Sequence, residues 1–156
     1  MVAKIKINRL LWFNLTRGLY RRGENERESG AFLLAPDNGV KIVRYIYYDD
    51  LDPHALDTGI VRFGADGYVK LWKICQEDKL HVVADVHTHP GKWTGQSESD
   101  AMSPMIPQKG HMALIVPCFA RNSRFGLRGA GIYEYLGNHR WRQWPAVSGK
   151  VRLTIV

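Results

Sequence analysis

Leu80-His81-Val82-Val83-Ala84-Asp85-Val86 is a short apolar run rich in β-branched residues, and His87-Thr88-His89-Pro90 follows it directly. The run predicts a β-strand. Side chains two positions apart on a strand point to the same face, so His87 and His89 can hold one metal ion between them. Pro90 ends the regular pairing, because proline has no N–H to donate to a sheet.

The segment after this strand predicts a third ligand. Residues 91–96 contain two glycines and can turn the chain back, which brings Asp100 to the two imidazoles. Two imidazoles and one carboxylate suit Zn²⁺, and three protein ligands leave a fourth position for water, as in catalytic zinc sites. A surface loop with incidental histidines is the alternative reading of such a short pattern.

The same residues carry a resemblance to a known family. His87-x-His89, seven further residues and Ser97-x-x-Asp100 resemble the signature of the JAB/MPN metalloproteases, also called JAMM isopeptidases. The resemblance implies a zinc peptidase in which the Ser97 hydroxyl donates a hydrogen bond to the oxyanion of the tetrahedral intermediate. Ser97 also has the position of an N-cap for a following helix, and both roles can hold.

The family also uses an upstream glutamate as general base. Arg27-Glu28-Ser29-Gly30-Ala31 resembles the Glu-x-Gly-Gly strand of the family, so the resemblance assigns this role to Glu28. Ala31 departs from the pattern, because many relatives have a second glycine there. Glu24 and Glu26 lie in a polar, turn-like segment, and we expect them to be solvated charges.

Three further residues near the signature have two readings each. Asp85 shares a strand face with the histidines and either orients one of them or lies exposed on the strand. Trp93 either lines a groove for the substrate or packs under the metal loop. His111 is at the start of a predicted strand and could be a fourth metal ligand. A structural role is expected instead, because the fourth coordination position of the metal is needed for water.

Composition indicates a soluble globular chain and one domain spanning residues 1–156. The chain is 45% hydrophobic and 24% charged, and its formal net charge is +7. No apolar stretch approaches the roughly 20 residues of a membrane span, so no membrane partner is expected. The positive charges are scattered and no nucleic-acid motif accompanies them, so no nucleic-acid partner is expected either. Cys75 and Cys118 form no Cys-x-x-Cys pair and predict buried free thiols in a reducing cytoplasm.

Periodicity predicts alternating strands and two main helices. The expected class is α/β (α+β): a JAB/MPN-like mixed, mainly antiparallel sheet flanked by the two helices, which is also what the resemblance implies. Strands are expected at 3–7, 28–35, 40–48, 80–86, 111–118, 129–136, 139–144 and 150–156, the main helices at 10–20 and 66–79, and a short helix from 99. Residues 36–39 predict a turn, and residues 49–54 a loop with solvent-facing aspartates.

The expected function is zinc-dependent isopeptidase or peptidase activity after the C-terminal tail of a ubiquitin-like protein. The chain resembles compact bacterial members found beside E1-like and E2-like enzymes, which implies such a system as partner and hints at antiviral defence. One alternative is a peptidase acting on a sulphur-carrier protein or on a small γ-linked substrate. A non-catalytic MPN scaffold ranks below both, because this chain keeps all three ligands and the glutamate, and a nucleic-acid binder ranks last.

Overall fold

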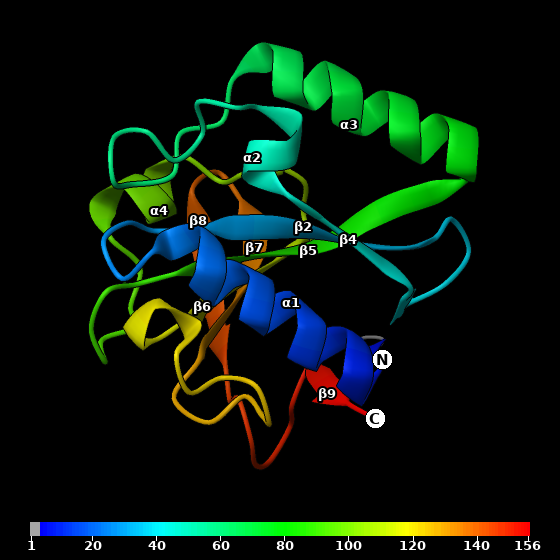
Figure 1. Cartoon of the computed structure of the whole chain (residues 1–156). Coiled ribbons are helices and arrows are strands. Elements are labelled where there is room, and N and C mark those ends of the chain that lie inside the picture. The colour runs from blue at the N-terminus through cyan, green and yellow to red at the C-terminus, as the bar shows by residue number, and fades with distance from the viewer. Residues whose placement is uncertain (1–3) are drawn as a thin grey trace.

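A six-stranded sheet forms the centre of the molecule (Figure 1). This computed structural model describes residues 4–156. The strand order is β4-β2-β5-β6-β7-β8, and every neighbouring pair is antiparallel except β5 and β6, which run parallel. The strands are β2 (Gly30–Pro36), β4 (Arg44–Tyr47), β5 (Leu80–Thr88), β6 (Met112–Val116), β7 (Gly131–Gly137) and β8 (Arg140–Trp144).

The two main helices cover opposite faces of this sheet. Figure 1 shows α3 (Ala65–Asp78) above the strands and α1 (Arg9–Gly23) below them. Helix α1 begins at the N-cap Asn8, whose side chain accepts a hydrogen bond from the Leu10 backbone N–H at 2.8 Å. It buries a stripe of side chains against one face of the sheet, while α3 packs on the other. The mixed, mainly antiparallel sheet with two main helices is therefore confirmed.

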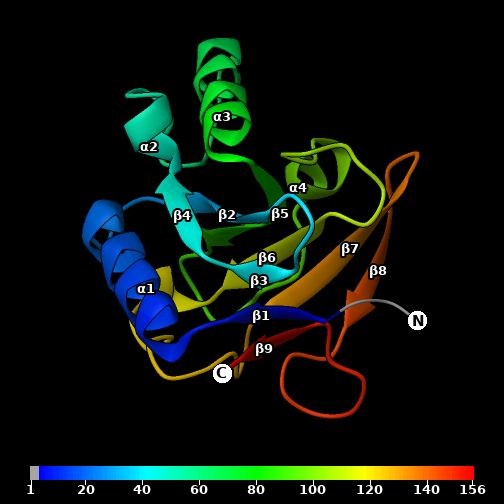
Figure 2. The ribbon, with the colours of Figure 1, turned by 90° about the vertical axis from the view of Figure 1, so that its right-hand side faces the viewer.

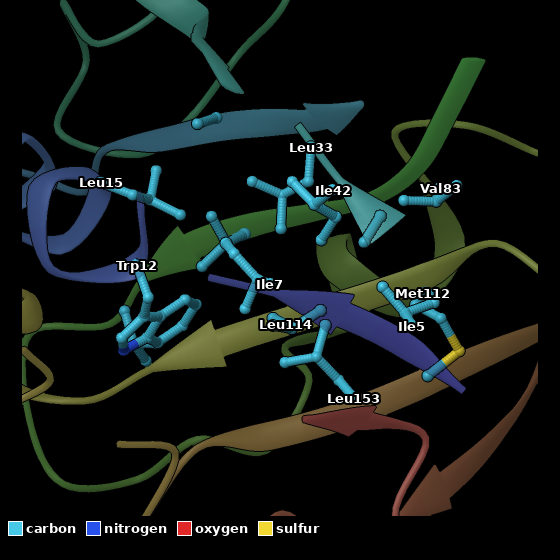
Figure 3. Close-up of a cluster of buried hydrophobic side chains, with 14 of the residues drawn as sticks. Ile5, Ile7, Trp12, Leu15, Leu33, Ile42, Val83, Met112, Leu114 and Leu153 are labelled. Carbon is cyan, nitrogen blue, oxygen red and sulfur yellow. The ribbon is translucent and has the colours of Figure 1, made fainter. Parts of the chain in front are cut away.

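A second, smaller sheet closes the α1 side of the core. Its strands β3 (Lys41–Ile42), β1 (Ile5–Ile7) and β9 (Leu153–Ile155) are all parallel and stand in the order β3-β1-β9. Figure 2 shows β1 and β9 side by side. Their apolar residues face the main sheet, and the cluster drawn in Figure 3 joins Ile7 and Leu153 to Leu114 of β6. Ala3, where the first strand was expected to start, lies outside the described residues.

Residues 40–54 differ from the expected single strand and loop. After Ile42 the chain leaves β1 and moves beside β2, where the Val43 N–H donates to the Leu34 carbonyl at 2.9 Å. The expected loop begins as a helical turn, α2 (Tyr48–Leu51), because the Tyr48 ring is buried against Phe32. Asp50 is exposed, as expected, but both Asp49 and Asp50 form ion pairs with Arg22.

The pairing of β2 with β5 sets up the site. Gly30 lies opposite His87 in this antiparallel pair. A Cβ at Gly30 would lie 2.2 Å from the Tyr48 ring, so only glycine lets that ring cover the start of β2. Ala31, by contrast, is fully buried in the core and continues the strand. Within residues 4–156 no helix has the length and apolar character needed to cross a membrane.

Candidate metal centre

Three side chains meet at the carboxyl end of β5. His87 and His89 lie two residues apart at the end of that strand, and both are buried. The chain then turns back into the short helix α4 (Glu98–Met102), which carries Asp100. The Nε2 atoms of the two histidines are 3.2 Å apart, and the Asp100 carboxylate lies 3.3 Å from His87 Nε2 and 3.2 Å from His89 Nε2. The predicted ligands are thus brought together, and among the described residues this is the one group of His, Cys, Asp and Glu that could hold a metal ion.

The spacing of these atoms fits zinc. Tetrahedral Zn²⁺ with bond lengths of about 2.0–2.1 Å separates its ligand atoms by about 3.3 Å. The two Nε2 atoms, 3.2 Å apart, match that length, and one oxygen of the Asp100 carboxylate lies within 4.8 Å of both. The donor set, two imidazole nitrogens and one carboxylate, is also one that zinc prefers.

Electrostatics favour the charged forms of Asp100 and His87. Burial disfavours ionised Asp100, but hydrogen bonds from His87 and His89 outweigh that effect and hold the pKa of Asp100 well below its usual range. Burial likewise lowers the pKa of His87, yet the hydrogen bond to Asp100 outweighs it and the pKa is raised. The site therefore presents a carboxylate clamped between two imidazoles.

A cleft of about 590 Å³ opens beside the ligands. His87 and Asp100 line it together with Glu28, while the rival Glu26 is exposed. Glu28 does not belong to the strand predicted for it: it precedes β2 by two residues, because its N–H donates to the Gly59 carbonyl at 2.8 Å instead of to the sheet. Burial raises the pKa of Glu28 above its ordinary value, and the neighbouring histidines oppose this in part.

Ser97 is the N-cap of α4, as the second reading of this residue predicts. Its Oγ accepts a hydrogen bond from the Asp100 N–H at 3.0 Å, and the Asp100 carboxylate accepts one from the Ser97 N–H at 3.0 Å. This capping box fixes the carboxylate that faces the histidines. Ser97 also lines the cleft, and its hydroxyl hydrogen is not used by the cap.

The same architecture occurs in solved structures of low sequence identity. A protein from Desulfitobacterium hafniense is 15% identical, with a TM-score of 0.64 over 97% of this chain and 94% of that one. A protein from Salinibacter ruber is 16% identical, with a TM-score of 0.59 over 93% and 92%. A JAB1/MPN domain protein from Archaeoglobus fulgidus is 14% identical, with a TM-score of 0.50 over 97% and 98%. No protein-family model matches the chain.

The chain has an MPN-like fold. The likeness extends over nearly the whole chain. At these identities it establishes the fold alone, so the chemistry must be argued from the site.

One contact inside this site was not foreseen from the sequence. The Trp93 carbonyl lies 3.1 Å from His89 Nδ1, and because a carbonyl can only accept, Nδ1 carries a proton and Nε2 is the nitrogen that a metal could bind. The Trp93 ring stacks on His89 with centroids 5.4 Å apart and remains 63% exposed. Trp93 is not among the residues that line the cleft, so its packing role is the one observed.

The loop that carries Trp93 is fastened to β7. The Tyr133 hydroxyl donates to the Thr94 carbonyl at 2.8 Å, and the Thr94 hydroxyl donates to the Gly129 carbonyl at 2.8 Å. A Cβ at Gly131 would lie 2.2 Å from the Thr94 carbonyl oxygen, which shows how closely the loop lies against the strand. No local pattern links residues so far apart in the chain, so sequence reasoning missed this contact.

Asp85 is buried and has other partners than the metal histidines. Its carboxylate accepts a hydrogen bond from the Tyr48 hydroxyl at 3.0 Å and lies 2.6 Å from His111 Nε2. The expectation of an exposed carboxylate is wrong, because β2 and β6 flank this strand and enclose the side chain. His111 thus bonds to Asp85 and does not join the ligand group, which agrees with the structural role expected for it.

Proposed function

We propose that this chain is a zinc-dependent peptidase or isopeptidase that cleaves after the C-terminal tail of a ubiquitin-like protein. The observation that carries the proposal is the convergence of His87, His89 and Asp100 at the edge of a cleft that His87 and Asp100 line together with Glu28. Zn²⁺ held by these ligands would act as a Lewis acid that polarises the scissile carbonyl and makes a water easier to deprotonate.

Glu28 has the properties of a general base. It lies in the cleft with two of the ligands, and its raised pKa brings it closer to the working pH at which proton transfer is efficient. In the proposed reaction its carboxylate takes a proton from the attacking water and then gives it to the departing amine. The Ser97 hydroxyl, already positioned by its cap, donates to the developing oxyanion.

The walls of the cleft suit an extended peptide. They combine the polar end at the ligands with apolar and aromatic side chains, which bury the tail while its scissile bond reaches the ligands. The apolar part is formed by Phe63, Tyr68, Pro104, Met105 and Trp141. The family resemblance extends this proposal in two ways: to a partner system of E1-like and E2-like enzymes, and to a role in antiviral defence. It does not identify the modifier.

The test separates metal binding from proton transfer. Glu28→Gln should retain one equivalent of zinc and the native fold but lose cleavage by about 10²–10⁴-fold, because only proton transfer is removed. Asp100→Ala should lose both zinc and cleavage. The measurements are metal content after chelation and reloading, and hydrolysis of ubiquitin-like tail peptides that carry a fluorogenic C-terminal amide.

Glu26→Gln is the matched control, since this glutamate is exposed two residues away. It should match the parent in both assays. Normal cleavage by Glu28→Gln would remove the general-base assignment. A parent protein that binds no zinc would favour the MPN scaffold instead.

A further inference from the structure

The surface formed by α1 and residues 118–130 has an unusual composition. These two segments contain seven arginines and no lysine, aspartate or glutamate. They lie side by side: Figure 1 shows α1 in front, with the yellow to orange chain of 118–130 below it. Trp12 of α1 joins them by donating from its indole N–H to the Ser123 carbonyl at 2.7 Å.

Most of these guanidinium groups have no carboxylate partner within residues 4–156, although Arg121 donates to the Asn25 side-chain oxygen at 3.2 Å. Arg22 is committed to Asp49 and Asp50. The others are exposed, and none of them forms an ion pair with a carboxylate of residues 4–156. We define the arginine face as the surface formed by six exposed residues: Arg9, Arg17, Arg21, Arg121, Arg124 and Phe125.

The arginine face is continuous and hollowed. Arg17, Arg21, Arg121 and Arg124 line one depression of about 330 Å³ between α1 and the 118–130 segment. Phe125, which is 83% exposed, lies 5.8 Å from the Phe13 ring of α1 and borders a second depression of about 220 Å³. That second depression is mostly aliphatic, and its lining includes Ala146, Val147, Val151 and Ile155.

We propose that the arginine face is a docking surface for an acidic protein partner. Unpaired arginines bind carboxylates in bidentate geometry, and a partner rich in Asp and Glu complements their charge. Protein interfaces are enriched in arginine and aromatic residues and depleted of lysine, as this surface is. The depression that Phe125 lines can bury an apolar side chain of a protein, and apart from that one ring its lining offers a base nothing to stack on.

The arginine face also adjoins the metal loop. The Cys118 N–H donates to the Gly91 carbonyl and the Phe119 N–H to the His89 carbonyl, both at 2.9 Å. A protein bound to the arginine face would therefore lie beside the ligands, although its docking requires no metal.

The test uses two labelled probes at physiological ionic strength: a short peptide that alternates glutamate with leucine and phenylalanine, and a single-stranded RNA of equal charge. Fluorescence anisotropy should show tighter binding of the peptide. Arg17→Glu combined with Arg124→Glu should lower peptide affinity by about tenfold or more. Lys70→Glu combined with Lys73→Glu, the same charge change on α3, should lower it by less than about threefold. Circular dichroism confirms that each variant is folded.

Two variants complete the experiment. Phe125→Ser changes no charge and should lower peptide affinity by about fivefold or more while leaving the salt dependence unchanged. His87→Ala should bind the peptide as tightly as the parent, because docking requires no metal. The peptide-binding result can therefore be interpreted even if the proposed zinc site proves wrong. Tighter binding of the RNA, equal losses in the two charge-reversal variants, or unchanged binding by Phe125→Ser would each overturn the proposal.

Discussion

Individual side chains in this protein take their roles from what encloses them. Asp85 and His87 lie two residues apart on one strand, yet one is hydrogen-bonded to Tyr48 and the other faces Asp100. Glu26 and Glu28 are equally close in sequence, and only Glu28 lines the cleft. Residue type and spacing therefore identify candidate site residues. Which of them belongs to the site depends on the elements that enclose each side chain.

Cys75 provides a prediction at this scale. Its side chain is buried among the apolar residues between α3 and the main sheet, and burial raises the pKa of its thiol. A smaller thiolate fraction and a closed environment slow alkylation, so iodoacetamide should modify Cys75 in the native protein at least about tenfold more slowly than in urea. Peptide mass spectrometry over a time course measures both rates. Equally fast modification in the two states would show that the α3 face is open.

At the scale of elements, the metal loop depends on strands that are distant in sequence. β5 supplies the histidines and α4 the carboxylate, but β7 holds the loop between them through Tyr133 and Thr94. Loss of a partner that orients a metal ligand typically lowers metal affinity or activity by about 10–100-fold.

Tyr133→Phe should therefore weaken zinc binding by about tenfold, because the loop that carries the Trp93 carbonyl loses one of its two hydrogen-bonded anchors while the ligands stay intact. Competition with a chromophoric chelator gives the affinity. Tyr135→Phe is the matched control, since this tyrosine lies on the same strand and its hydroxyl accepts from the His139 N–H, away from the site. Identical zinc affinity in both variants would show that the loop holds its shape without β7.

At the scale of the whole molecule, the core is closed by segments from both ends of the described chain. β1 and β9 pair with each other and cover the face of the main sheet that α1 leaves open (Figure 2). Leu153 of β9 is 2% exposed within that cluster.

Leu153→Ala should lower the free energy of unfolding by about 2–5 kcal/mol, the range found for buried leucines that leave a cavity. Leu10→Ala, at a position that is 66% exposed, should change it by less than about 0.5 kcal/mol. Urea unfolding followed by tryptophan fluorescence measures both. A Leu153→Ala variant as stable as the parent would mean that the small sheet adds little to the core.

Much of the fold follows from local pattern. The helix expected at 10–20 extends over Arg9–Gly23, the one expected at 66–79 over Ala65–Asp78, and the hairpin around Gly137-Asn138 joins β7 and β8. The ligand group was also predictable, because a two-residue strand period and a short return loop are local properties. The structure of residues 40–48 was not predictable from the sequence. This apolar run is divided between two sheets, and the point at which the chain passes from one to the other depends on packing in the assembled core.

The sequence by itself determined which residues could bind a metal: His87 and His89 on one strand face, with Asp100 a short loop away. Tertiary structure alone decided that Glu28 shares their cleft, that Asp85 pairs with Tyr48 and His111, and that Tyr133 anchors the metal loop. The physical reason is that the periodicity and spacing of residues determine only which side chains share a face of one strand or helix. The neighbours of that face are fixed by strand register and by burial of the common core.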